Sequence, residues 1–264
     1  MNLREKYGEW GIILGATEGV GKAFAEKIAS EGMSVVLVGR REEKLQELGK
    51  SISETYGVDH MVIRADFAQS DCTDKIFEAT KDLDMGFMSY VACFHTFGKL
   101  QDTPWEKHEQ MINVNVMTFL KCFYHYMGIF AKQDRGAVIN VSSLTAISSS
   151  PYNAQYGAGK SYIKKLTEAV AAECESTNVD VEVITLGTTI TPSLLSNLPG
   201  GPAGEAVMKT AMTPEACVEE AFDNLGKSLS VIAGENNKAN VHNWQANKTD
   251  DEYIRYMGSF YSNN

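Results

Sequence analysis

Short apolar runs alternate along the chain with longer segments whose apolar residues recur at helical spacing. Seven of the runs predict strands, and the first six show almost no alternation between polar and apolar positions. Strands of this kind are expected where a parallel sheet is covered on both faces. The predicted strands are residues 11–14, 35–38, 61–65, 88–94, 137–141, 181–186 and 229–233.

The segments between these strands predict helices, among them residues 21–30, 42–56 and 71–83. In the second segment the apolar residues recur on one face. Strands that alternate with helices form right-handed βαβ units, and these build a doubly wound sheet. The pattern therefore predicts an α/β fold with a mostly parallel seven-stranded sheet and helices on both faces. Because no repeat or linker divides the chain, residues 1–264 are expected to form one domain.

Two regions depart from the alternation. Residues 191–213 are rich in proline and glycine, with apolar residues between them that include Leu194 and Leu195. Their composition favours a surface loop, and the alternative is an apolar flap over a ligand, because long irregular insertions are often lids. The tail, residues 238–264, carries many aromatic side chains. We expect these to dock on the body of the protein or on a neighbouring subunit.

The composition is that of an ordinary globular protein of 264 residues, with 44% hydrophobic and 22% charged residues. No apolar run approaches the ~20 residues of a membrane span, and a net charge of −10 opposes binding to nucleic acid. The five cysteines and five histidines lack the spacings of a disulfide framework or a metal site, so no metal is expected. Residues 1–11 lack the apolar core of a secretory signal, and we expect a cytoplasmic protein with reduced thiols.

The first predicted strand leads directly into a glycine-rich turn and a helix. Gly15, Gly19 and Gly21 have the spacing Gly-x-x-x-Gly-x-Gly, and Thr17 and Glu18 lie between them. Such a turn lets the backbone approach a pyrophosphate, and the N–H groups at the start of the helix favour an anion. Glycines also serve simple turns, but their position between a strand and a helix favours a dinucleotide site.

The second predicted strand is followed by Gly39, Arg40 and Arg41. A site selective for NAD has an acidic side chain here for the ribose hydroxyls, whereas two arginines suit the 2′-phosphate of NADP. The alternative is a solvated basic start to the next helix. Asp66, after the third strand, could accept from the adenine amino group or cap the segment that follows, and both interpretations remain open. The predicted cofactor is NADP(H).

The fifth predicted strand and the helix after it carry the candidate reactive groups. Ser143 follows the strand, Tyr156 comes thirteen residues later, and Lys160 lies four residues beyond Tyr156. Residues at i and i+4 share a helical face, so the Lys160 ammonium is expected beside the Tyr156 phenol, where it would lower the pKa of that phenol. A phenol of lowered pKa can exchange a proton with an alcohol or a carbonyl, and Ser143 can hydrogen-bond the same oxygen.

These motifs together resemble the short-chain dehydrogenases/reductases of the classical type, and the likeness runs from about residue 10 to residue 233. The resemblance implies a Rossmann-like fold in which Tyr156 is the acid–base and Ser143 orients the carbonyl. It also implies that Lys160 holds the nicotinamide ribose and that Tyr156 contacts the cofactor as well as the substrate.

Two further segments carry the same resemblance. Asn115 matches a helix asparagine whose backbone holds a water in a proton relay. Ile190 and Thr191 match residues that meet the nicotinamide carboxamide. The chain departs from the family after the fourth strand, where residues 92–95 replace an Asn-Asn-Ala-Gly turn. This replacement puts His95 near the expected nicotinamide, as a substrate contact or as a packed imidazole.

Residues 86–93, 101–109, 188–202 and 251–261 lie largely outside these motifs, and they resemble bacterial NADP-dependent 7β-hydroxysteroid dehydrogenases that act on bile acids. The resemblance implies that a 7β-hydroxyl and a 7-ketone are interconverted, and apolar flap residues suit a steroid skeleton. It also implies a homodimer or homotetramer. The alternatives are a 3-ketoacyl or other carbonyl reductase of the same family and a non-catalytic dinucleotide-binding regulator.

Overall fold

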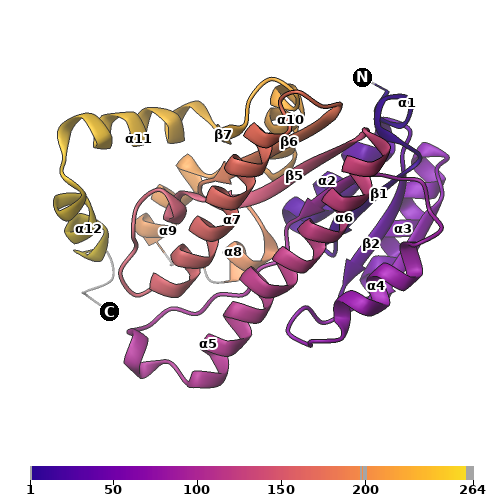
Figure 1. The fold of residues 1–264 in the computed structure, drawn as a ribbon. Helices are drawn as coiled ribbons and strands as arrows, with labels where there is room; N and C mark the ends of the chain where they lie inside the picture. Colours follow the sequence, from indigo (N-terminus) through magenta and orange to yellow (C-terminus); the bar gives the residue numbers. More distant parts are fainter. Residues whose placement is uncertain (1, 197, 199–200, 260–264) are drawn as a thin grey trace.

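The computed structural model describes residues 2–196, 198 and 201–259 (Figure 1). Its centre is a seven-stranded sheet in which all neighbouring strands are parallel, in the order β3-β2-β1-β4-β5-β6-β7. This order confirms the doubly wound, Rossmann-like fold that the sequence predicts. The strands are β1 (Trp10–Leu14), β2 (Ser34–Gly39), β3 (His60–Arg64), β4 (Met85–Tyr90), β5 (Gly136–Ser143), β6 (Val179–Leu186) and β7 (Ser230–Ile232).

Helices cover both faces of the sheet and bury two separate apolar clusters. The face with Ile13, Leu37 and Ile184 is covered by α1 (Leu3–Tyr7), α2 (Gly19–Ser30), α3 (Glu42–Tyr56) and α10 (Pro214–Asn224). The face with Ile12, Met88 and Val138 is covered by α4 (Cys72–Thr80), α6 (Phe119–Gln133) and α7 (Ala154–Glu173). Because alternate residues of a strand point to opposite faces, this double cover explains the unbroken apolar runs Ile12–Leu14 of β1 and Val35–Val38 of β2.

The fourth strand ends earlier than the sequence predicts. It was expected at residues 88–94 but spans Met85–Tyr90. The amides of Val91 and Ala92 both donate to the carbonyl oxygen of Leu14, at 2.9 and 2.8 Å, and the chain then leaves the sheet. Residues 91–94 are apolar because they form a loop beside a cavity, and an apolar run alone does not distinguish this from a strand.

The long segment after this loop contains α5 (Trp105–Ile112), a π-helical segment (Asn113–Thr118) and α6. A π-helical segment inside an α-helix is rare and is often found at a functional site. A short 3₁₀ turn at Leu100–Asp102 precedes α5, and another at Leu144–Ala146 joins β5 to α7.

The insertion at residues 191–213 is mostly helical where the structure describes it, so the expected irregular loop is wrong, whereas the interpretation as a flap over a ligand stays a prediction. It contains α8 (Pro192–Ser196) and α9 (Gly201–Thr210). A parallel bridge between Thr189 and Met212 closes its base. Proline at a first helical turn is favourable, so Pro192 starts a helix here instead of excluding one.

The tail forms α11 (Glu235–Asn247) and α12 (Asp250–Ser259), which extend away from the sheet in Figure 1. Trp244 is buried, and its ring stacks on Tyr253 with 4.3 Å between the ring centroids. Two further aromatic residues of the tail, Phe260 and Tyr261, lie outside the described residues. Within the described part of the chain, no helix has the length and apolar character needed to cross a bilayer.

Candidate active site

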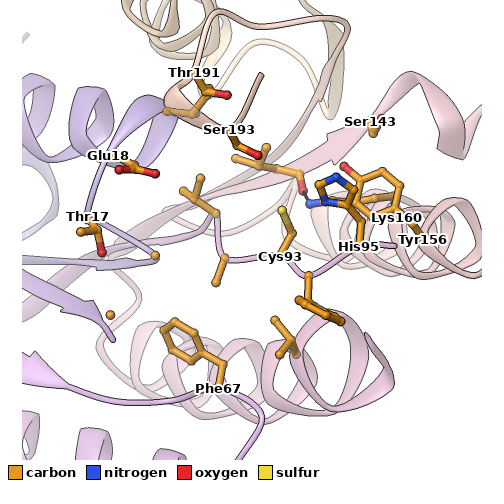
Figure 2. Close-up of a pocket in the computed structure, with 18 of the residues that line it drawn as sticks. Thr17, Glu18, Phe67, Cys93, His95, Ser143, Tyr156, Lys160, Thr191 and Ser193 are labelled. Carbon is orange, nitrogen blue, oxygen red and sulfur yellow. Dashed lines mark hydrogen bonds between the residues drawn. The ribbon is translucent and has the colours of Figure 1, made fainter. Parts of the chain in front are cut away.

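A cavity of about 790 Å³ opens at the carboxyl ends of the central strands. This is the edge of a doubly wound sheet at which ligands bind, next to the point where the strand order reverses. Figure 2 shows Thr17 and Glu18 on one side of the cavity and Ser143, Tyr156, Lys160 and His95 grouped on the other. The predicted site residues on its wall are Gly15, Thr17, Glu18, Gly39, Arg40, Arg41, Asp66, His95, Ser143, Tyr156, Lys160 and Thr191.

The glycine-rich turn is built so that three chain segments touch without side chains between them. Gly15 has φ +103°, and a Cβ there would lie 2.6 Å from the amide nitrogen of Ala92. A Cβ on Gly21 would overlap the carbonyl oxygen of Gly15. A Cβ on Gly19 would lie 2.9 Å from Thr191 Cγ2. The turn therefore has the close approach and the free helix N-terminus that a pyrophosphate requires.

The end of β2 forms the second part of the cofactor side. Gly39 leaves room for Thr17, because a Cβ at Gly39 would lie 2.7 Å from Thr17 Oγ1. Arg41 Nη1 pairs with Glu18 Oε2 at 2.9 Å, and this hydrogen bond holds the pKa of Glu18 below its usual range. Arg40 is exposed on the cavity wall. Two guanidinium groups thus lie where the sequence predicts the 2′-phosphate.

For Asp66 the structure shows the capping interpretation, and the contact with the adenine amino group stays a prediction. Its Oδ1 accepts from the amide of Ala68 at 3.1 Å, so it caps the turn after β3. It also lies on the cavity wall, next to Phe67. The second carboxylate oxygen leaves acceptor capacity toward the cavity.

The end of β5 holds α7 in register against the cavity. Lys160 Nζ donates to the carbonyl oxygen of Val141 at 2.9 Å, and Ser142 Oγ donates to the carbonyl oxygen of Lys160 at the same distance. Both bonds are buried. They place Tyr156, one turn earlier on α7, beside Ser143 at the carboxyl end of the strand.

The protonation of this group differs from the sequence prediction. Burial raises the pKa of Tyr156, and a hydrogen bond with the Ser143 hydroxyl opposes the rise. Burial also lowers the pKa of Lys160. Lys160 Nζ lies 5.9 Å from the centroid of the Tyr156 ring and is bonded to a main-chain carbonyl. The expected lowering of the Tyr156 pKa by Lys160 is therefore wrong for this structure, in which desolvation outweighs the ammonium.

His95 lies over the reactive group. Its ring centroid is 5.6 Å from that of Tyr156 and 5.4 Å from that of Phe97. Partial burial and the neighbouring Lys160 charge lower the pKa of His95, so the imidazole is neutral at pH 7. A neutral imidazole can donate or accept a hydrogen bond, which suits contact with a substrate as well as packing.

Asn115 does not reach the cavity with its side chain. It lies in the π-helical segment and is buried, and its amide group forms two hydrogen bonds with the main chain of Phe94. Asn115 Oδ1 accepts from the Phe94 amide at 2.8 Å, and Nδ2 donates to the Phe94 carbonyl oxygen at 2.7 Å. The side chain thus fixes the loop that carries His95, whereas the relay implied by the family resemblance would use its backbone.

Several predicted residues lie off the cavity wall. Gly19 and Gly21 shape the turn from behind, and the amide of Ile190 bonds to the Met212 carbonyl oxygen at 2.8 Å. Leu194 is half-buried and Leu195 is 52% exposed, and neither lines the cavity.

Some residues that line the cavity belong to no motif recognised in the sequence. They directly follow strand ends or lie on the segments opposite: Phe67, Val91, Cys93, Phe94, Gln110, Val114, Thr189 and Ser193. The carboxyl end of each parallel strand is the signal that could have located Phe67 and residues 91–94. Gln110, Val114 and Ser193 reach the cavity through tertiary packing and carry no local signal.

Comparison with known proteins decides the family. The short chain dehydrogenase family model matches residues 9–198. The chain belongs to this family. Members of the family bind NAD(P), and the glycine-rich turn described above fits such a dinucleotide.

Individual relatives are much closer than the family as a whole. The chain is 76% identical over 261 residues to the 7β-hydroxysteroid dehydrogenase of Mediterraneibacter gnavus, with 99% of each chain covered. The 7β-hydroxysteroid dehydrogenase of Collinsella aerofaciens gives the same identity and coverage. A solved structure from a study of 7β-hydroxysteroid dehydrogenase stereoselectivity superimposes with a TM-score of 0.95 and 75% identity, over 97% of this chain and 99% of that chain. The resemblance to these enzymes that the sequence analysis reports is confirmed.

Proposed function

We propose that this protein interconverts the 7β-hydroxyl and 7-keto forms of bile acids with NADP(H). The observation that carries the proposal is 76% identity to two 7β-hydroxysteroid dehydrogenases over nearly the full length of both chains. The cavity adds physical support, because it brings Ser143, Tyr156 and Lys160 together beside the glycine-rich turn. A protein that only sensed a dinucleotide would not need this combination of hydroxyl, phenol and ammonium.

In the proposed reaction, each side chain has a distinct task. The bound nicotinamide supplies the hydride in reduction and accepts it in oxidation. Tyr156, whose raised pKa keeps it protonated at neutral pH, donates a proton to the 7-oxygen of the ketone during reduction. The Ser143 hydroxyl donates a hydrogen bond to the same oxygen and stabilises its developing charge. Lys160 supplies positive charge that favours the phenolate left behind.

The other contacts with the substrate and the cofactor are proposed from the positions of residues around the cavity. His95 faces the reactive phenol and is assigned to the steroid, as is the loop held by Asn115. Arg40 and Arg41 are assigned to the 2′-phosphate of NADP(H). Thr191 is assigned to the nicotinamide end, since it lies on the cavity wall above the glycine-rich turn.

A homodimer or homotetramer is also proposed. Large apolar side chains remain exposed on the helices that run alongside α7: Trp105 is 72% exposed and Tyr124 is 80% exposed. Such surfaces often mark subunit contacts, and light scattering of the purified protein measures the subunit number. The five cysteines are free thiols, which supports the cytoplasmic location expected from their spacing.

The deciding experiment is NADPH oxidation with 7-ketolithocholate, followed by identification of the epimer formed. The proposal expects the 7β-alcohol as product and a clear preference for NADPH over NADH. A 3-ketoacyl thioester serves as the competing substrate, and faster turnover of that thioester would overturn the bile-acid assignment. Formation of the 7α-alcohol would overturn the stereochemical assignment.

A substitution of Tyr156 tests the proposed catalytic assignment. Tyr156→Phe removes the proton donor and keeps the ring, so NADPH binding should persist while kcat falls by roughly a thousandfold or more. The neighbouring Tyr162→Phe on α7 is the matched control, because Tyr162 lies off the cavity wall. Turnover near that of the wild type in Tyr156→Phe would remove the proposed acid–base.

A further inference from the structure

An acidic side chain stands inside the proposed phosphate site. Glu18 lies on the cavity wall between the glycine-rich turn and the end of β2. Its Oε2 pairs with Arg41 Nη1 at 2.9 Å and lies 3.5 Å from Lys44 Nζ. One carboxylate oxygen therefore engages two cations, although a phosphate site needs those cations for its own ligand.

The carboxylate does not serve as the cap of its helix. Glu18 is the N-cap residue of α2, yet its side chain makes no capping hydrogen bond. An acidic N-cap side chain ordinarily accepts from the first free amides of its helix. Here the carboxylate turns instead toward Arg41, and its lowered pKa keeps it ionised at neutral pH.

The side-chain charges around Glu18 can be compared with the charge of the 2′-phosphate. Arg40, Arg41 and Lys44 supply three positive charges, and Glu18 removes one. A 2′-phosphate carries close to two negative charges at neutral pH. The four side chains together balance such a group, and the phosphate must compete with Glu18 for two of the three cations.

We propose that Glu18 is a specificity-determining counter-ion that competes with the 2′-phosphate of NADP(H) for Arg41 and Lys44. It weakens the binding of the phosphorylated cofactor and leaves the binding of NAD(H) nearly unchanged. The inference rests on the proposed preference for NADP(H). It goes beyond that proposal, because it assigns an opposing role to a residue on the same wall of the cavity.

The distinction between the two cofactors follows from charge. The 2′-phosphate meets both the repulsion of the Glu18 carboxylate and the loss of the Arg41 pair. An unmodified ribose hydroxyl meets neither, and the carboxylate can accept a hydrogen bond from it. Removal of the Glu18 charge should therefore act on one cofactor only.

The test measures binding without turnover. Fluorescence titration of NADPH and of NADH gives both dissociation constants for the wild type and for Glu18→Gln, which keeps the side-chain length. We expect the NADPH constant to fall roughly five- to twentyfold in Glu18→Gln, the size of effect that one nearby charge has on a dianion near a protein surface. The NADH constant should change by less than about twofold or rise.

The matched control is Glu26→Gln. Glu26 lies on the same helix and pairs with Lys22 at 3.6 Å, away from the cavity wall. The Glu26→Gln substitution removes one negative charge from the protein without changing the pair between Glu18 and Arg41. It should leave the dissociation constants of NADPH and NADH unchanged. The gain of Glu18→Gln should also shrink in about 1 M salt, where the Debye length is about 3 Å.

A double substitution tests whether the effect of Glu18 depends on Arg41. When Arg41 is already replaced by Ala, the exchange Glu18→Gln should raise NADPH affinity much less than it does in the wild type. The reason is that the Arg41 guanidinium, for which Glu18 and the phosphate compete, is absent. The proposed competition would be overturned if the NADPH dissociation constant of Glu18→Gln were equal to or higher than that of the wild type. It would also be overturned if NADH affinity rose as much as NADPH affinity. Wild-type protein that binds NADPH no more tightly than NADH would instead overturn the proposed cofactor preference.

Discussion

The two sides of the cavity are built differently. On the cofactor side, much of the wall comes from two short runs of the chain, Gly15 to Glu18 in the glycine-rich turn and Gly39 to Arg41 at the end of β2. On the substrate side, the wall is assembled from distant segments, such as Phe94, Gln110 and Ser193. Local contacts position the first side, whereas the second depends on tertiary hydrogen bonds between Asn115 and the Phe94 loop.

This difference predicts which substitutions should affect cofactor binding and which should affect the substrate. A defect in the glycine-rich turn should disturb cofactor binding directly, because its segments touch without intervening side chains. A defect in the substrate wall should leave the turn intact, because the two sides lie on different strands. The predictions below test this separation.

The largest effect is expected for Gly21→Ala. The added Cβ would overlap the backbone carbonyl oxygen of Gly15, so the turn must open. We expect NADPH affinity to fall by at least about a hundredfold, the upper end of what overpacking costs. Calorimetric titration measures the loss, and circular dichroism checks that the fold remains. Gly128→Ala is the control, since a Cβ there meets nothing within 4 Å. Normal affinity in Gly21→Ala would show that the turn tolerates an open form.

Asn115→Ala should separate the two sides of the cavity. It leaves the amide and carbonyl of Phe94 without their partner and so frees the loop that carries His95. We expect kcat/KM for the steroid to fall roughly ten- to a hundredfold, while the NADPH dissociation constant changes by less than about threefold. Asn113→Ala, in the same π-helical segment, is the control. Equal losses in both measurements would mean that the two sides are mechanically coupled.

A stability prediction concerns Glu182, on β6 behind the substrate side. Neither of its carboxylate oxygens has a hydrogen-bond partner among the described residues, and burial, together with the smaller effect of the Glu220 charge, raises its pKa from 4.5 to about 8. Between these two pKa values, the unfolded chain releases a proton that the folded protein retains. The free energy of unfolding should therefore fall as the pH rises from about 5 to 8 and level off above that range.

Glu182→Gln removes this dependence. Urea unfolding at pH 5 should give nearly equal stabilities for wild type and variant, and at pH 8 the variant should be more stable by roughly 3 to 4 kcal/mol. Glu205→Gln, on the exposed surface of α9, serves as the control. A wild-type curve parallel to that of Glu182→Gln across this pH range would show that Glu182 is already ionised in the folded protein.

The smallest effect is expected for Leu195→Ala. This side chain is 52% exposed and lies off the cavity wall. KM for the steroid should change by less than about twofold, because little apolar area leaves contact with the ligand. A tenfold rise in KM would show instead that α8 closes over the bound steroid, as the flap interpretation of the sequence expects.

The sequence predicts most of the cofactor side because its signals are local. Glycines at fixed spacing between a strand and a helix leave few backbone arrangements, and Gly39 followed by two arginines lies in register with that turn. The sequence also predicts that Tyr156 and Lys160 lie together, because they share one helix, and both line the cavity beside Ser143. The protonation of Tyr156 was not found, because spacing on a helix does not report burial or the carbonyl oxygen that takes the Lys160 ammonium.

The substrate side shows what pattern analysis misses. Residues 91–94 have the composition of a strand, but two amides bonded to Leu14 turn them out of the sheet. Residues 191–213 have the composition of a loop, yet their described part is largely helical. In both segments the conformation depends on partners far along the chain, and Gln110 and Ser193 reach the cavity through the same kind of contact.

The bridge between Thr189 and Met212 separates the insertion from the sheet. The amide of Ile190 donates to Met212, and the amide of Met212 donates to Thr188, so both ends of the insertion are tied at one point. Changes in length or sequence between these ties leave the pairing of β6 and β7 undisturbed. Beyond Thr191 and Ser193, which line the cavity, a segment tied in this way should accept changes of length or sequence without moving the strand end that carries Ser143.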